Sequence, residues 1–258
     1  MDASGEGGEM MRLNLLIDEF EGLLHIILKD LKAYYFKPPN ISWGILFPLV
    51  LALAFTLKSP MASRELAPGL VATAALFGTT SMEAIVVTFE KRVKALERLI
   101  MAPISLLTLL IAKILGGVIF GFMISSIMVM ISILILNCSI MDPILFLTAL
   151  LLTLFALSSL GALIAFSVKE VFEAQTLSNY FRFPMLFLSG VFLPVNSMPL
   201  PLQIVAWIFP LTYSVEAFKI SMSGLSTSTY PTIDLLVLLG YSLLLTYLSL
   251  IAIRKSLK

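Results

Sequence analysis

The sequence is poor in the residues from which most enzyme and metal sites are built. It contains one cysteine, Cys138, and one histidine, His25. A single cysteine excludes an internal disulfide, and the position of His25 outside the apolar segments excludes a histidine-based metal or haem site within a membrane. The phosphate-binding pattern Gly-x-x-x-x-Gly-Lys-Ser/Thr is also absent, so ATP binding through a P-loop is excluded. We therefore expect no catalytic residue, no cofactor and no metal in this chain.

Charged residues are scarce as well, at 13% of 258 residues, whereas 59% are hydrophobic and the mean hydropathy is +1.01. Soluble domains average about 25% charged residues and would not tolerate so much apolar surface. The net charge of +1 gives no sign of a nucleic-acid partner, and none is expected. The composition predicts an all-α polytopic membrane protein whose surroundings are the lipid bilayer.

Apolar segments of roughly the length of a membrane-crossing helix recur along the chain. The six predicted spans are residues 41–57, 68–89, 114–136, 143–168, 177–193 and 233–253. Before them, residues 1–11 are predicted to be a disordered tail. Residues 12–40 are predicted to form an amphipathic helix, because apolar side chains recur at helical spacing from Leu13 to Leu31. This helix either packs on the rest of the protein or lies in the membrane interface, and residues 41–258 form the transmembrane domain.

The lysines and arginines are distributed unevenly between the two sides of this topology. The N-terminal segment, the second and fourth connections and the C-terminal tail carry 12 of them, and the other connections carry 3. Positive residues are retained on the cytoplasmic side. The sequence therefore predicts that both termini are cytoplasmic. The protein itself is expected in the plasma membrane.

The stretch "LSGVFLPVNSMPLPLQIVAWIFPLTY" (residues 188–213) is apolar but is interrupted by Pro194, Pro199, Pro201 and Pro210. A helix between Pro201 and Pro210 would be about 12 Å long, whereas the hydrocarbon core is about 30 Å thick. A full crossing would also place the basic tail outside. We therefore predict a re-entrant helical hairpin at the outer surface, just before the last span.

A second informative stretch is "EKRVKALERLIMAP" (residues 90–103), in the basic connection between the second and third spans. It is predicted to form one short amphipathic helix over 90–102, ended by Pro103. If its role is only structural, it is an interfacial helix. If it has a functional role, it is a docking element for a soluble partner. The residues predicted for this role are Glu90, Arg92, Val93, Lys94, Leu96, Glu97, Arg98 and Ile100.

Two acidic residues, Glu83 and Asp234, lie within predicted spans. Asp234 begins the last span, where an acidic residue suits a helix N-terminus. Ionisable groups in a membrane are costly and are functional by default. Glu83 is interpreted as a pathway residue, as a helix-pairing residue, or as a group close to the interface.

Two blocks of the sequence resemble the membrane subunits of ABC-2 type ABC transporters. The first is "EKRVKALERLIMAPISLLTLLIAKIL", and the second is "FLSGVFLPVNSMPLPLQIVAWIFPLTYSVEAFK", which is similar to the carboxy-terminal signature of the family. The matching positions are Glu90, Glu97, Leu99, Pro103, Ile104, Ser105, Lys113, Ser189, Gly190, Pro194, Pro199, Pro210, Tyr213, Glu216 and Ala217. One departure is that many members have Gly-Thr where this chain has Lys94 and Ala95, which removes a flexible spot.

The resemblance implies one subunit of an exporter for a drug or another small molecule. A second copy, or a homologous permease, would complete the passage, and a separate ATP-binding subunit would dock on the helix at 90–102. The positions predicted for the pathway or its outer gate are Glu83, Pro194, Pro199, Ile208, Pro210, Tyr213 and Glu216. The alternative function is an ion-coupled secondary transporter or channel that uses Glu83 as its proton site.

Overall fold

The computed structural model describes residues 18–35, 45–54, 60–102, 104–224 and 229–256, and these residues form helices and turns without any strand. An α-helix covers residues 18–30, a π-helical turn follows at Leu31–Tyr35, and a short helix covers Ile45–Ala54. The remaining elements are α3 (Pro60–Arg92), α4 (Ala95–Ile100), α5 (Leu106–Leu134), α6 (Pro143–Ser167), α7 (Val171–Leu188), η2 (Val195–Ser197), α8 (Leu200–Ala206), α9 (Pro210–Ser223) and α10 (Pro231–Ser256).

Four of these helices contain a segment long and apolar enough to cross a membrane. They are Leu66–Arg92, Leu106–Leu134, Pro143–Ser167 and Pro231–Ser256, and they correspond to the predicted second, third, fourth and sixth spans. The predicted boundaries were too narrow for the second and third, because α3 continues to Arg92 and α5 begins at Leu106. The residues added at the end of α3, 90–92, are charged, whereas those added at the start of α5, 106–113, are mostly apolar.

The two other predicted spans are not among these four helices. The described part of the first is the helix Ile45–Ala54, and the rest of 41–57 lies outside the described residues. Most of the residues predicted for the fifth, 177–193, lie in α7, which begins earlier at Val171 and ends at Leu188. The predicted tail at 1–11 also lies outside the described residues.

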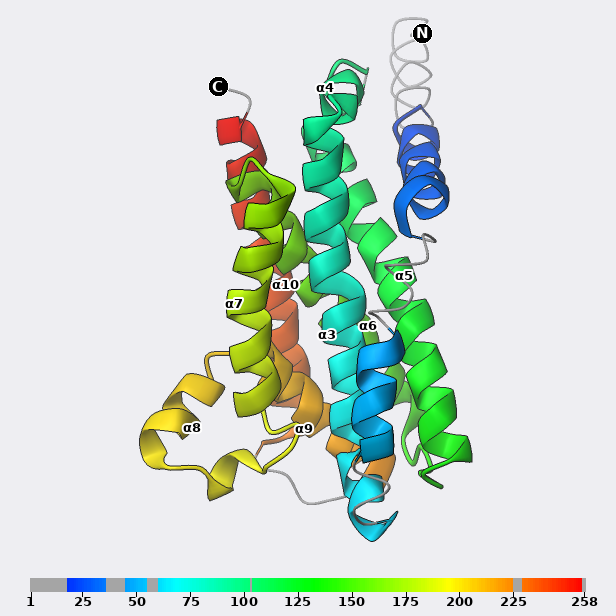
Figure 1. Cartoon of the computed structure of the whole chain (residues 1–258), viewed down its shortest axis with the longest axis vertical. Helices are drawn as coiled ribbons and strands as arrows, with labels where there is room; N and C mark the ends of the chain where they lie inside the picture. Colours follow the sequence, from blue (N-terminus) through cyan, green and yellow to red (C-terminus); the bar gives the residue numbers. More distant parts are fainter. Residues whose placement is uncertain (1–17, 36–44, 55–59, 103, 225–228, 257–258) are drawn as a thin grey trace, which may run out of the picture.

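Helix α3 occupies the centre of the bundle and packs on α5, α6, α7 and α9, while α6 packs along α10 (Figure 1). Small residues allow these helices to approach closely. A Cβ atom added to Gly121 of α5 would lie 2.3 Å from the Thr79 methyl carbon of α3. Serine hydroxyls donate across helices, from Ser158 Oγ to the Ile114 carbonyl (2.8 Å) and from Ser249 Oγ to the Ser159 carbonyl (3.1 Å). Such close packing and polar bonds replace the hydrophobic effect between helices in a bilayer.

The two ends of the bundle carry different elements. The helix at 18–30, α4 and the last turns of α10 lie at one end, whereas α8 lies at the opposite end (Figure 1). In the helix at 18–30, Ile26 and Ile27 are buried and His25 is exposed, while Phe20, Leu24 and Leu28 of the predicted apolar face are also exposed. We refer to these two ends as the α4 end and the α8 end.

Candidate functional site

The predicted docking helix at 90–102 is two helices in the structure, so the prediction of one helix is wrong. Helix α3 continues through Glu90 and Arg92, and the chain turns at Val93 and Lys94 before α4 begins. Lys94 has a φ of 56°, in the left-handed region, and its backbone N–H donates to the Lys91 carbonyl at 3.0 Å. A left-handed residue cannot continue an α-helix. The pairing of Glu90 with Lys94 that one continuous helix would allow is therefore absent.

Helix α4 presents its charged side chains outward. Glu97 and Arg98 are exposed, as are Arg92 and Lys94 just before it. Leu96 is 5% exposed and belongs to the core, and Ile100 is partly buried against that core. Leu96 and Ile100 thus face the bundle, whereas the apolar Val93 is exposed in the turn. The exposed surface here is formed by Arg92, Val93, Lys94, Glu97 and Arg98.

Glu90 is not part of that surface but is completely buried among charged residues. Lys113 of α5 donates to Glu90 and to Asp30 Oδ2, the latter at 2.7 Å. Lys29 also pairs with both carboxylates, at 3.0 Å from Asp30 Oδ1. We call these four residues the ion-pair cluster. Its formal charges cancel, which is the condition for holding ionised groups inside a protein.

The ion-pair cluster joins three segments that are far apart in the sequence: the helix at 18–30, the end of α3, and α5. Asp30, Glu90 and Lys113 are each at most 1% exposed. Partial burial lowers the pKa of Lys29, but the carboxylates of Glu90 and Asp30 more than offset this, so its pKa is raised above the ordinary value. The N-terminal helix is thus fixed electrostatically beside the α4 end of the bundle.

Glu83 lies deeper in the same region and is fully buried. Its Oε2 accepts a hydrogen bond from the Tyr35 hydroxyl, and its Oε1 has no hydrogen-bond partner within the described part of the chain. Two glycines allow this packing: a Cβ at Gly117 would lie 3.1 Å from Glu83 Oε2, and one at Gly161 would lie 2.9 Å from Glu83 Cβ. Of the three interpretations of Glu83, this geometry favours the pairing of helices.

The prolines at the α8 end mark the beginnings of helices. Pro194 and Pro199 are the N-cap residues of η2 and α8, and Pro210 is the first residue of α9. Proline suits a helix start because its missing N–H would be unpaired there and its φ is already helical.

The turn between α8 and α9 is held by hydroxyl groups. Tyr213 donates to the Trp207 carbonyl at 3.0 Å, and Tyr241 of α10 donates to the Ile208 carbonyl. The Ile208 side chain is 61% exposed. The predicted residues Ile208 and Tyr213 therefore meet at one turn that is fastened to α10.

Gly190, which follows α7, has a φ of 82° and packs beside an ion pair. Lys219 Nζ is 3.0 Å from Glu216 Oε1, and a Cβ at Gly190 would lie 3.5 Å from that ammonium group. A positive φ favours glycine. Gly190 of the Ser-Gly pair thus lies beside Glu216, the glutamate of the same sequence block. This arrangement allows the end of α7 to pack closely on α9.

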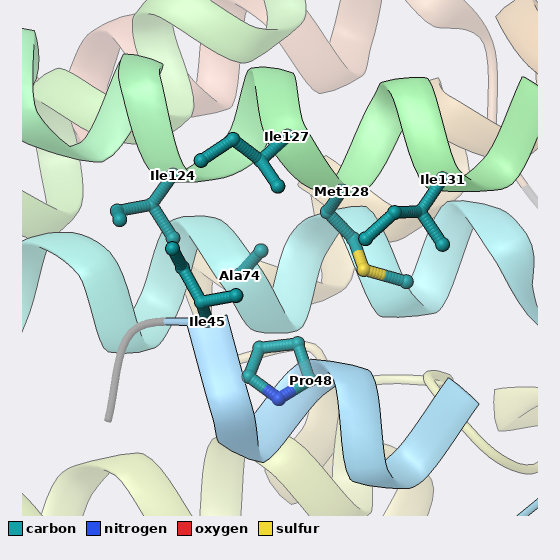
Figure 2. A pocket seen from close by; sticks show the side chains of 7 residues that line it. All are labelled: Ile45, Pro48, Ala74, Ile124, Ile127, Met128 and Ile131. Carbon is teal, nitrogen blue, oxygen red and sulfur yellow. The ribbon is translucent and has the colours of Figure 1, made fainter. Parts of the chain in front are cut away.

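A gap between Ile45–Ala54, α3 and α5 is lined only by apolar residues (Figure 2). Its lining residues are Ile45, Pro48, Ala74, Ile124, Ile127, Met128 and Ile131. The gap is too narrow to admit a water molecule. It is a packing seam that seats the short helix on the bundle.

Sequence reasoning missed most of the ion-pair cluster. Lys113 was noted as a pattern residue, but its partners Asp30 and Glu90 were not identified, and Glu90 was assigned to the docking surface. The available signal was a lysine within an apolar run, because such a group requires a counter-charge. Tyr35, the partner of Glu83, was missed because a tyrosine near the interface is unremarkable in sequence.

A search among curated proteins gave no match. The family model described as "ABC-2 type transporter" matches residues 21–223, which include the ion-pair cluster, α4 and the α8–α9 turn. The chain therefore belongs to the ABC-2 type transporter family and is the transmembrane component of an ABC transporter.

Proposed function

We propose that this chain forms the export pathway of an ABC transporter for a small molecule and couples to a separate ATP-binding subunit through α4. The observation that carries the proposal is the surface of α4, in a chain that belongs to this family. Glu97 and Arg98 are exposed there, while Leu96 anchors the helix to the core. A short helix linked directly to α3 and α5 can transmit a displacement of a bound partner into both.

The ion-pair cluster supports this coupling role. It fixes the helix at 18–30 to the end of α3 that leads into α4. A partner that pushes on α4 would therefore move the N-terminal helix, α3 and α5 together. Buried ion pairs resist such separation, because a broken pair leaves an uncompensated charge.

The proposed topology has six crossings with both termini in the cytoplasm, in the plasma membrane. The helix Ile45–Ala54 would be the described part of the first crossing. α7, with 18 residues, spans about 27 Å and would be the fifth. α8 has 7 residues and α9 has 14, about 10 and 21 Å, so neither spans a hydrocarbon core of about 30 Å. Together they would form the re-entrant hairpin at the outer mouth.

A second copy of this chain, or a homologous permease, would complete the passage. Large apolar side chains are exposed on α7, among them Phe172, Tyr180 and Phe187. On α10, Leu243 and Tyr247 are exposed in the same way. These faces suit contact with lipid or with the second subunit.

The test is co-purification with the ATP-binding subunit, followed by transport in vesicles that contain both. Arg98→Glu is expected to reduce co-purification, because it reverses an exposed charge of α4 without touching the core. Arg254→Glu is the matched control, since Arg254 is exposed at the end of α10. Leu96→Asp is a poorer probe, because it would also place a charge in the core.

Equal co-purification of Arg98→Glu and the control would refute docking at α4. Transport that is insensitive to ATP and abolished by Glu83→Gln would instead support the ion-coupled alternative.

A further inference from the structure

A groove of about 670 Å³ lies between the ends of α6 and α10. Its lining comes from the last turn of α6, the connection to α7, and the last turns of α10: Leu163, Phe166, Ser167, Val168, Lys169, Leu248, Ile251, Ala252, Lys255 and Ser256. The last turns of α10 and the start of α7 lie at the α4 end of the bundle (Figure 1). The groove is thus placed where two membrane-crossing helices leave the apolar layer.

The rim of the groove is basic. Lys169 and Lys255 line it from two different segments, and both side chains are exposed. The two carboxylates that follow Lys169 both cap the start of α7. The Glu170 side chain accepts from the Glu173 backbone N–H, and Glu173 Oε2 accepts from the backbone N–H groups of Lys169 (3.1 Å) and Glu170 (3.4 Å). Two lysines that converge on one groove attract an anion more strongly than the same lysines spread over the surface.

A third lysine, Lys91, offsets the partial negative charge at the C-terminus of α6, next to the groove. Lys91 Nζ donates to the carbonyls of Ala165 (2.7 Å) and Val168 (3.2 Å) and lies 5.1 Å from the Phe166 ring. The unpaired carbonyls at a helix C-terminus carry a partial negative charge that would repel an anion. Lys91 offsets this charge through contacts with Phe166 and Val168, two residues that line the groove.

The floor of the groove is apolar. Leu163 and Phe166 of α6 line it together with Leu248 and Ile251 of α10 and the small side chain of Ala252. Leu248 is exposed on the same helix as Leu243 and Leu244, which face the surroundings of the bundle. The groove is therefore continuous with the lipid-facing surface of α10.

We propose that this groove binds an anionic phospholipid, with its phosphate between Lys169 and Lys255 and one acyl chain along Leu248 and Ile251. Ser256 also lines the groove, and its hydroxyl group is available to donate to a phosphate oxygen, whereas Ser167 Oγ donates to the Leu163 carbonyl at 2.7 Å. Basic pockets between membrane helices are typical headgroup sites. A bound lipid would link α10 to the α6–α7 connection. This inference does not depend on the ATP-binding partner.

The test measures thermal unfolding of the purified full-length chain in zwitterionic nanodiscs, with and without added phosphatidylglycerol. Native mass spectrometry of the same samples measures the bound lipid. The lipid is expected to raise the Tm of the wild type and to remain bound to it. In the double variant Lys169→Gln/Lys255→Gln, the affinity should fall roughly 30-fold, because each lysine near an anionic membrane surface contributes about 1 kcal/mol.

The matched control is Lys32→Gln/Arg254→Gln, which removes the same charge from exposed positions outside the groove. It should respond to phosphatidylglycerol as the wild type does. A second variant, Ala252→Trp, fills the apolar floor without a change of charge and should also lose the response, while circular dichroism verifies its helical content.

Three results would overturn the proposal. They are an unchanged response in the double variant, an unchanged response in Ala252→Trp, and an equal effect of phosphatidylcholine on the wild type. Inorganic phosphate that reproduces the full shift in Tm would show that an anion alone suffices and would overturn the lipid assignment as well.

Discussion

Lys113 is a buried ammonium group whose charge is balanced by two carboxylates from other segments, Asp30 and Glu90. Lys113→Met is expected to destabilise the protein by about 3–5 kcal/mol, since removal of one partner leaves buried charge without compensation. Denaturant or thermal unfolding in detergent measures the loss.

The double variant Lys113→Met/Glu90→Gln tests whether charge balance is the cause. It leaves Lys29 with Asp30, one charge of each sign, and should be more stable than Lys113→Met alone. Lys94→Met, at an exposed position, is the control for loss of a lysine. If the double variant were as unstable as the single one, packing rather than charge would explain the effect.

Lys94 holds a left-handed conformation between α3 and α4, with a φ of 56°. Lys94→Gly is expected to stabilise the chain by about 1 kcal/mol, because a side chain is penalised in this region and glycine is not. Lys94→Ala removes the same charge but keeps the penalty, so it should give no gain. The difference in unfolding temperature between the two variants measures the backbone effect, and equal values would contradict it.

At Lys94 the prediction from sequence was wrong, because the chain turns there instead of continuing as one helix. A run of good helix formers from Glu90 to Ile100 predicts one helix, and the glycine that many relatives have here was interpreted as a flexible spot. The structure shows that a specific turn is required there, which this chain makes with a lysine. Local propensity did not reveal the turn, because tertiary packing of Leu96 and burial of Glu90 on opposite sides of it determine the break.

At the scale of helices, more of the structure was predicted correctly from the sequence than at the turn around Lys94. Long apolar runs identified α3, α5, α6 and α10, because a crossing helix needs about 20 apolar residues. Prolines at 143, 210 and 231 each begin a helix, which a proline signal predicts.

The ion-pair cluster could not be predicted in the same way. Lys113 and Asp30 are 83 residues apart, and Lys113 and Glu90 are 23 apart. Helical periodicity describes one segment at a time and contains no information about which segments meet. The assignment of Glu90 to the docking surface therefore failed, although its helix was identified.

The α8–α9 turn is the element where a single charge should affect transport most selectively. Ile208→Lys is expected to reduce transport several-fold, because a lysine within an apolar layer costs about 2.5–3.5 kcal/mol and would pull the turn toward water. The turn lies at the α8 end, away from α4, so co-purification with the ATP-binding subunit should be unchanged. Transport in reconstituted vesicles measures the effect.

Ile208→Gln, which is polar but uncharged, is the control for this variant and should have a smaller effect. Normal transport by Ile208→Lys would show that the turn does not enter the apolar layer during export. Loss of co-purification would show instead that the substitution disturbs the whole bundle.

For the molecule as a whole, α4 and α8 lie at opposite ends of the bundle, so coupling between them would have to act along its length. The exposed charges of α4, the ion-pair cluster and the basic groove lie at the α4 end, while α8 lies at the other (Figure 1). In the proposed coupling, a displacement of α4 would reach α3 and α5 first, because α4 lies between them in the chain. Because α3 packs on α5, α6, α7 and α9, a movement of α3 would be passed on to all four of these helices.

This arrangement predicts that the two ends face opposite sides of the membrane, with the α4 end in the cytoplasm. In a background of Cys138→Ala, which removes the buried native thiol, single cysteines are placed at two exposed serines. Ser139→Cys lies in the connection between α5 and α6, and Ser256→Cys ends α10. The replacement of oxygen by sulfur disturbs either site little. A membrane-impermeant maleimide should label Ser139→Cys in intact cells and Ser256→Cys only after the cells are opened. The reverse pattern would invert the topology and would place α4 where no cytoplasmic ATP-binding subunit could reach it, so this experiment tests the proposed coupling as well as the orientation.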